Sequence, residues 1–157
     1  MTPARESHKR LATNRKALRD YHVLERFEAG IALRGTEVKS ARDGHLTLSG
    51  AYGRAEPDGI TLHNMTIQPY EHGNRFNHEP DRPRRLLLHK REIERLRAHV
   101  EQKGCTLVPL NAYLKKGLVK LEIGLCRGKT HGDKRESMRR KTADREAARA
   151  IAERRRR

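Results

Sequence analysis

The chain has 157 residues, a length typical of one compact domain with a short extension. Lys and Arg number 36 against 20 Asp and Glu, a formal net charge of +16, while 34% of the residues are hydrophobic and 4% aromatic. This charge predicts a polyanionic partner. The short apolar runs, as at 86–88, and a start without a signal-peptide pattern argue against a membrane or secreted protein, so we expect a cytoplasmic location.

Charge and apolar content divide the chain into three parts. Residues 1–14 are basic without apolar periodicity and predict a flexible arm. Residues 128–157 hold 12 Lys and Arg against 5 Asp and Glu with few apolar side chains, so we expect a basic tail that is disordered on its own. Residues 15–127 contain nearly all of the core-forming side chains and are the part that can fold by itself.

In chain order, the first predicted elements of the body are strands and one short helix. Aromatic and branched residues across 21–33 predict a long strand that bends at Gly30. Thr36 can cap a short helix whose end is marked by Gly44. Leu46 and Leu48 alternate with polar residues, and the turn at 57–59 leads into another strand from residue 60.

The middle of the body is predicted to hold a loop, a brief strand and a helix. Three prolines and many charges favour a loop over residues 68–84, and residues 85–88 predict an apolar strand. Over 89–103, Ile93, Leu96 and Val100 recur at helical spacing. Gly104 stands where a helix-terminating glycine is expected.

The last two strands, 106–114 and 118–126, are predicted to form a hairpin. In the second of them apolar and polar residues alternate strictly, which is typical of a half-buried antiparallel strand. A three-residue loop at 115–117 would pair Leu114 with Leu118 and leave Cys105 and Cys126 one residue out of register. A two-residue turn at 115–116 would make the two cysteines direct partners. Their spacing forms no disulfide framework and agrees with a reducing compartment.

Short antiparallel strands with peripheral helices in roughly 110 residues favour a mainly β fold, a small closed barrel of the OB-like kind. No enzyme motif accompanies it. The segment GLCRGKT at 124–130 lacks the spacing of a phosphate-binding loop, and the histidines, His72 and His78 included, lack metal-ligand spacing. No nucleophile turn is present. We therefore predict no catalysis, no cofactor and no metal.

Basic clusters beside aromatic or apolar groups are the remaining candidates for function. One cluster is Arg15, Lys16 and Arg19, followed by Tyr21 and His22. The other surrounds the strand at 86–88 and comprises Arg82, Arg84, Arg85, His89, Lys90 and Arg91. Lys and Arg bind phosphates, while Tyr and His can stack on unpaired bases, so this pattern predicts binding of a folded RNA. The alternative is an ordinary solvated charged face.

The order of these motifs resembles the small protein B (SmpB) family, the SsrA-binding proteins of bacteria. The resemblance is carried by NRKALRDYHVLERFEAGIALRGTEVKSARDG at 14–44, RRLLLHKREI at 84–93, KKGLVKLEIGLCRGK at 115–129 and DKR at 133–135. It implies an OB-like six-stranded antiparallel barrel with helices and no catalysis. The implied function is to bind the tRNA-like domain of transfer-messenger RNA (tmRNA) and to deliver it to stalled ribosomes.

The resemblance also implies partners. These are tmRNA, the ribosome with its decoding site and rRNA, and elongation factor Tu through the RNA complex, with the protein as a monomer. A rival interpretation is a general basic OB-fold protein of the ribosome.

The family's RNA face matches Asn14, Tyr21, Glu28, Leu87 and His89. Asn14 can cap the helix that starts at Arg15 or offer its amide to a base. Glu28 can organise nearby arginines or accept a hydrogen bond from a base amino group or a 2′-hydroxyl. Leu87 would be a core residue by default, but the resemblance places it on the RNA face, and His89 can cap the following helix.

The tail resembles the ribosome-facing extension of the family, with matching residues Gly128, Lys129, Asp133, Lys134 and Arg135. Gly132 occupies the place where family members often carry histidine, and His131 lies one residue earlier. From residue 134 onward the composition favours a helix. We therefore expect residues 128–157 to become helical on the ribosome, filling the decoding site and the message channel.

Overall fold

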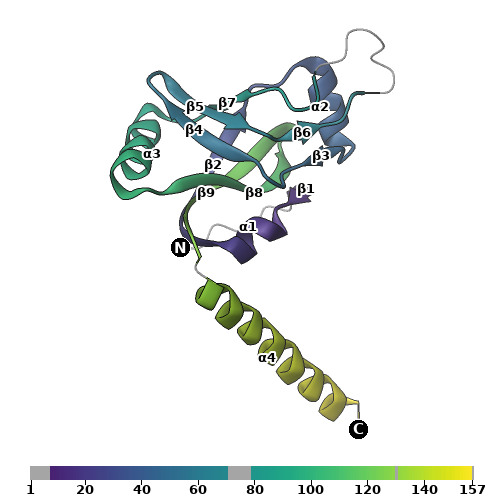
Figure 1. Ribbon diagram of the computed structural model, residues 1–157. Helices are drawn as coiled ribbons and strands as arrows, with labels where there is room; N and C mark the ends of the chain where they lie inside the picture. The colour runs from purple at the N-terminus through teal and green to yellow at the C-terminus, as the bar shows by residue number, and fades with distance from the viewer. Residues whose placement is uncertain (1–7, 71–78, 130, 157) are drawn as a thin grey trace.

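The computed structural model describes residues 8–70, 79–129 and 131–156 (Figure 1). The strands are β1 Lys9–Thr13, β2 Tyr21–Ile31, β3 Leu46–Thr47, β4 Tyr52–Glu56, β5 Gly59–His63, β6 Thr66–Ile67, β7 Arg84–Leu87, β8 Thr106–Lys115 and β9 Leu118–Gly128. The helices are α1 Arg15–Asp20, α2 Gly35–Arg42, α3 Lys90–Lys103 and α4 His131–Arg155. Within these described ranges, no helix is long and apolar enough to cross a membrane.

A 7-stranded sheet in the order β1-β8-β4-β5-β7-β2-β9 forms the body. Strand β8 also pairs with β9, so the pairings through β8, β4, β5, β7, β2 and β9 close into a ring, and β1 joins the outside of β8. Each of these pairings is antiparallel. The prediction of a mainly β antiparallel fold with peripheral helices is confirmed.

The core lies inside this ring. Its largest cluster includes the fully buried Ile60, Leu62, Leu107 and Ile123, and α3 packs onto it through Leu96. Because β9 alternates as predicted, Leu121, Ile123 and Leu125 point inward while Lys120 and Glu122 stay partly exposed. Gly104 ends α3 in the left-handed conformation, with a φ of 64°, as the sequence predicts.

A smaller core cluster lies between α1 and the sheet. It consists of Ala17, Val108, Leu110 and Cys126, with Tyr21 packed against it. Burial raises the pKa of the Cys126 thiol to about 11, so the thiol stays protonated at neutral pH. This cluster joins the helix to the strand that precedes the tail.

The β8–β9 turn corrects the predicted hairpin register. Lys115 pairs with Leu118, so the turn contains only Lys116 and Gly117, and both have positive φ, 51° and 77°. Two left-handed residues match the twist of a two-residue hairpin, which explains why the three-residue loop is wrong. A register shift between Pro109 and Asn111 then places Thr106, not Cys105, opposite Cys126. Both cysteines are buried and free.

Two further predictions need correction. Residues 9–13 are not a flexible arm: they form β1 on the edge of β8, where Leu11 and Ala12 pack against the core. Residues 1–7 of that arm lie outside the described residues. Helix α2 begins at Gly35 with Arg34 as its N-cap, not at Thr36. The reason is that Glu37 accepts a hydrogen bond from the Arg34 amide, 2.8 Å away, and so closes the first turn.

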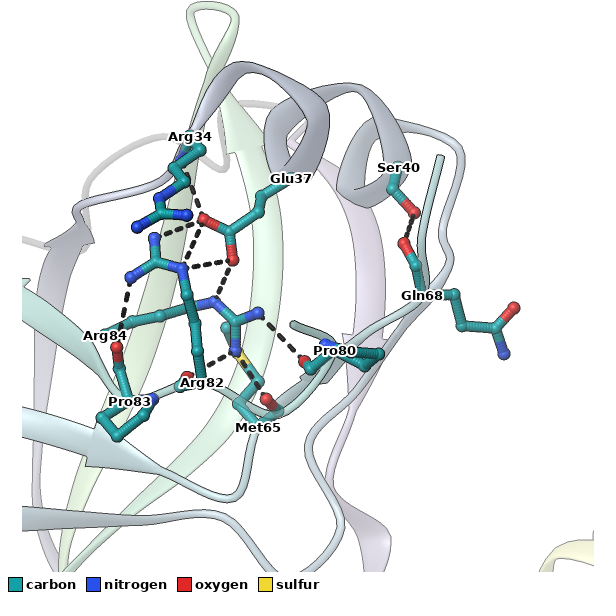
Figure 2. Close-up of polar contacts among 9 residues, drawn as sticks. All are labelled: Arg34, Glu37, Ser40, Met65, Gln68, Pro80, Arg82, Pro83 and Arg84. Atoms are coloured by element: carbon teal, nitrogen blue, oxygen red, sulfur yellow. Dashed lines mark hydrogen bonds and ion pairs between the residues drawn. The ribbon is translucent and has the colours of Figure 1, made fainter. Parts of the chain in front are cut away.

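A buried ion-pair cluster connects α2 to β7 (Figure 2). The Glu37 carboxylate is fully buried and accepts hydrogen bonds from Arg84 Nε at 2.5 Å and from Arg82 Nε at 3.1 Å. The Arg84 guanidinium donates further hydrogen bonds to three carbonyls, Met65 at 2.6 Å, Arg82 at 3.0 Å and Pro80 at 3.0 Å. Each nitrogen of the buried Arg84 guanidinium therefore has an acceptor, as a buried charge requires.

The surroundings of Glu37 decide its charge. Burial alone would raise its pKa, but hydrogen bonds from Arg82, from the Arg34 amide and from Arg84 outweigh burial and lower the pKa. The unfolded chain has the higher pKa, near 4.5. The stabilisation by Glu37 is therefore complete above that value and is lost as the pH falls through the lower pKa of the folded state.

We predict that Glu37→Ala lowers the free energy of unfolding by about 3–5 kcal/mol, because it leaves Arg84 charged and buried without its carboxylate. Urea unfolding followed by circular dichroism measures this loss. Glu101→Ala is the matched control, since its ion pair with Arg97 is solvent-exposed and its loss should cost less than about 1 kcal/mol. Equal effects of the two substitutions would contradict the structural role of the cluster.

Candidate RNA-binding surface

Four elements form a groove at the outer face of β7. It has a volume of about 490 Å³ and lies between β2, β7, β9 and the start of α3. We name it the Leu87 groove; its walls include Glu28, Gly30, Arg85, Leu87, His89 and Lys120. The structure therefore brings together four of the residues that the sequence predicted for RNA binding: Glu28, Arg85, Leu87 and His89.

The alternation of β7 decides which of its side chains reach the groove. Arg84 and Leu86 point into the interior, while Arg85 and Leu87 point outward. Leu87 is 55% exposed, although an apolar residue on a strand would by default be in the core. Arg85 also donates a hydrogen bond to the backbone carbonyl of Asp58, and its guanidinium lies 3.1 Å from the Asp58 carboxylate. An exposed leucine between cationic groups can press on the face of an unstacked base.

Gly30 allows the two sides of the groove to approach. It pairs with Leu87 in β7 and with Lys120 in β9. A Cβ atom added at Gly30 would lie 3.2 Å from Leu87 Cβ and 3.5 Å from Lys120 Nζ, so a larger residue would require Leu87 to shift by a few tenths of an ångström. Lys120 is a groove residue that was not predicted. Its alternation in β9 indicated an outward position, but the register that places it beside Leu87 could not be read from the sequence.

Glu28 stands at one side of the groove with its side chain 41% exposed. It accepts a hydrogen bond from the Tyr113 hydroxyl at 2.5 Å, and Lys115 Nζ lies 3.3 Å from each carboxylate oxygen. Its partners are thus a tyrosine and a lysine, where the sequence suggested arginines. The Tyr113 hydrogen bond is the main reason why the pKa of Glu28 is lowered, with Lys115 and Lys120 adding to it against the effect of burial.

His89 and Lys90 lie where α3 begins. His89 is the N-cap residue, as predicted, and Glu92 closes the first turn by accepting a hydrogen bond from the His89 amide at 3.3 Å. Both His89 and Lys90 are exposed. They extend the basic rim of the Leu87 groove.

Five other predicted RNA-binding residues lie on α1 and at the start of β2, away from the Leu87 groove. Arg15, Lys16 and Arg19 are exposed on α1, His22 is exposed on β2, and Tyr21 is half-buried against the smaller core cluster. Glu28 lies seven positions after Tyr21 in β2, roughly 23 Å along an extended strand. The structure therefore divides the predicted RNA-binding residues into two surfaces, the Leu87 groove and the α1 end.

Two predicted contact residues, Asn14 and Arg84, are buried. Asn14 caps α1 by accepting a hydrogen bond from the Ala17 amide, and its own amide donates to the carbonyls of Pro109 at 2.9 Å and Leu48 at 3.2 Å. The capping alternative is therefore confirmed, and in this structure the side-chain amide is paired with two backbone carbonyls. Arg84 was predicted at the RNA surface, but it shares the inward face of β7 with Leu86 and binds Glu37 instead.

The tail leaves the body beside α1. Gly128 ends β9, and the next amide, that of Lys129, donates to the Asp20 carbonyl at 2.9 Å. Lys134 Nζ lies 3.5 Å from the Asp20 carboxylate, while Arg135 is exposed. From there α4 projects away from the body (Figure 1). Residues 131–155 are helical in this structure, whereas the sequence predicted a helix only on the ribosome. The side chains of Asp133 and His131 lie outside the described residues.

A family model with the description SmpB protein matches residues 11–153. The SsrA-binding protein of Carboxydothermus hydrogenoformans is 55% identical over 141 residues, which cover 90% of this chain and 95% of that protein. The chain belongs to the SmpB family. The SsrA-binding protein of Geobacillus thermodenitrificans is 50% identical over 144 residues, 92% of this chain and 93% of that protein.

A solved structure agrees with this membership. One of its chains, from the work described as "tmRNA-SmpB: a journey to the center of the bacterial ribosome", is 49% identical to this chain. The TM-score is 0.65, over 82% of this chain and 94% of that chain. The SmpB fold therefore extends over most of this chain.

No group of three or more His, Cys, Asp or Glu suited to a metal ion is found among the residues that the structure describes. His72 and His78, which the sequence analysis considered as metal ligands and rejected, lie outside those residues. The chemistry available in the Leu87 groove is hydrogen bonding, charge pairing and apolar contact.

We predict that Asn14→Ala lowers the free energy of unfolding by about 1–3 kcal/mol, because the helix cap is lost and the carbonyls of Leu48 and Pro109 lose their donor. Thermal and urea unfolding measure this change. Leu87→Ala, at an exposed position, should change stability by no more than about 0.5 kcal/mol. A stable Asn14→Ala protein would contradict the structural role assigned to this amide.

Proposed function

We propose that this protein binds the tRNA-like domain of transfer-messenger RNA and brings it to stalled ribosomes in trans-translation. Its relatives are named SsrA-binding proteins, and a structural neighbour is described as tmRNA-SmpB at the centre of the bacterial ribosome. The observation in this chain that carries the proposal is the Leu87 groove, because it gathers an exposed leucine, an ionised carboxylate and several cations.

The groove supplies three kinds of contact to a folded RNA. Leu87 offers an apolar surface to an unstacked base, and Glu28 accepts a hydrogen bond from a base amino group or a 2′-hydroxyl. Arg85, Lys90 and Lys120 pair with phosphates. The ring of strands that carries the groove is, in this proposal, an OB-like barrel, an architecture suited to RNA. The role is one of binding rather than catalysis.

The α1 end and the tail have a second role in the proposal. Arg15, Lys16 and Arg19 bind phosphates there, and Tyr21 and His22 border them. The tail, with Gly128, Lys129, Asp133, Lys134 and Arg135, occupies the decoding site, and α4 extends into the message channel. The protein acts in the cytoplasm as a monomer, and elongation factor Tu joins through the RNA.

A general ribosome-associated RNA-binding protein would share the basic tail, whose residues 138–156 are exposed. Copurifying RNA separates the two functions. A single RNA of a few hundred nucleotides with a tRNA-like end supports the proposal, whereas bulk rRNA alone supports the rival.

We predict that Leu87→Arg weakens binding of the tRNA-like RNA at least about tenfold, since the apolar contact is replaced by a bulky hydrated charge. Because Leu87 is exposed, the melting curve should stay close to that of the parent protein. Gel-shift titration and circular dichroism provide the two measurements. Leu24→Arg, at a 48% exposed position of β2 outside the groove, is the matched control. Equal affinity of the two variants would remove the groove from the RNA-binding site.

We also predict that a chain cut after Gly128 still folds and binds the tRNA-like RNA, yet fails to support tagging on stalled ribosomes. The core lies before the cut, while the tail holds +7 of the +16 net charge, so only nonspecific RNA affinity should fall. A reconstituted tagging assay measures the outcome. The control is the full-length chain, which should support tagging. Tagging by the truncated chain at the full rate would refute a ribosomal role of the tail.

In the free protein, α4 makes few contacts with the body, so the tail should be flexible by NMR and become protected from protease on the ribosome. This expectation follows from its low apolar content and its exposed charges.

A further inference from the structure

Two side chains of β8 reach across β9 to contact Glu28 on β2. In the sheet, Glu28 is paired with Glu122 of β9, and Tyr113 is paired with Lys120, so the contact from Tyr113 to Glu28 is diagonal. The Glu122 carboxylate is engaged by Arg26, 2.5 Å away. Glu28 is therefore left to the donors of β8, the Tyr113 hydroxyl at 2.5 Å and Lys115 Nζ at 3.3 Å.

We propose that Tyr113 is a positioning residue for RNA recognition: its hydroxyl holds the Glu28 carboxylate in the orientation in which it accepts hydrogen bonds from RNA in the Leu87 groove. This inference rests on the proposed function. The ligand group it concerns is a hydrogen-bond donor of the RNA, a 2′-hydroxyl or a base N–H.

The geometry assigns different roles to the two donors. Tyr113 contacts only Oε2, whereas Lys115 Nζ is equally far from both oxygens, so the tyrosine defines the orientation and the lysine supplies charge. The Tyr113 ring is itself held, because it is half-buried and stacks on His8 with ring centroids 5.2 Å apart. A carboxylate has about four lone-pair sites, so acceptor capacity remains for the RNA.

The charges around Glu28 come from four elements. Tyr113 and Lys115 belong to β8, Lys120 and Glu122 to β9, Arg85 to β7, and His89 and Glu92 lie at the start of α3. The Tyr113 hydrogen bond comes first among the causes that lower the pKa of Glu28. Only the ionised carboxylate is a pure acceptor, so binding that uses Glu28 weakens as the pH falls through its pKa. Removing the hydroxyl raises that pKa.

The test is Tyr113→Phe in the full-length chain, with a transcript of the tRNA-like domain as the probe. At neutral pH we expect about tenfold weaker binding, the loss that follows when a charged acceptor is misplaced. In affinity measured against pH, the acid-side loss should begin at a higher pH than in the parent protein. Titration of the Glu28 carboxyl carbon by NMR should show the same upward shift. The two proteins share every other titratable group of the groove, so the difference between their profiles isolates Glu28.

Tyr70→Phe is the matched control, because Tyr70 is a partly exposed tyrosine that lines neither the Leu87 groove nor the α1 end. It should leave the affinity and its pH profile unchanged. Circular dichroism melts of both variants separate a loss of fold from a loss of positioning, and an upward shift of the Glu28 titration in a fully folded Tyr113→Phe protein supports the inference.

A Glu28→Ala background completes the test. If Tyr113 acts through Glu28, adding Tyr113→Phe to Glu28→Ala causes no further loss of affinity. A further loss of similar size overturns the inference, because Tyr113 would then contact the RNA itself. Normal binding by Tyr113→Phe beside a weakened Glu28→Ala also overturns it and leaves the proposed function intact. Normal binding by Glu28→Ala instead removes Glu28 from the proposed site.

Discussion

The fully buried ion pair between Glu37 and Arg84 is the constraint on which the rest of the structure depends. It joins α2 to β7, and the Arg84 guanidinium also binds the carbonyls of Met65, just before β6, and of Pro80, four residues before β7. Because side chains alternate along a strand, an inward Arg84 requires an outward Leu87. The interior charge thus sets the direction of the leucine that we place against RNA, although the two residues have different partners and different roles.

Much of the fold could be predicted from local patterns. Strand alternation in residues 118–126, the helical spacing up to Gly104 and the turn at 57–59 depend on neighbours in sequence, and the structure agrees with them. The errors arose where contacts with residues far away in the sequence decide the structure of a segment. Arg84 was predicted as a surface cation, but it is paired with the buried Glu37 carboxylate. Residues 9–13 were predicted to be flexible, but they pair with the edge of β8. Charge alone does not distinguish a solvated arginine from a paired one.

The candidate site was predictable in part, for a similar reason. Glu28, Leu87 and His89 came from resemblance to a family and fell into one groove, whereas Lys120 and Tyr113 were missed. Their places depend on strand register. The two-residue turn at Lys116 and Gly117 sets Tyr113 opposite Lys120, and β2 pairs with β9 with a register shift between Val23 and Glu25. Such a shift moves residues by one position relative to the neighbouring strand, and no local pattern reveals it. The chemistry of a side chain can be read from the sequence, but its neighbours across a sheet cannot.

The attachment of α4 has a mechanical consequence. The helix has 25 residues, about 37 Å in length, and close to its start it is held by Asp20, through the Lys129 amide and the Lys134 ammonium. A rotation of about 10° at that joint moves the far end by roughly 6 Å, more than one helical turn. The body can therefore aim the tail but cannot hold its tip in one place. The position of the far end of α4 must therefore be fixed by the surface that binds it. The helix acts as a lever arm that the body orients and the partner holds in place.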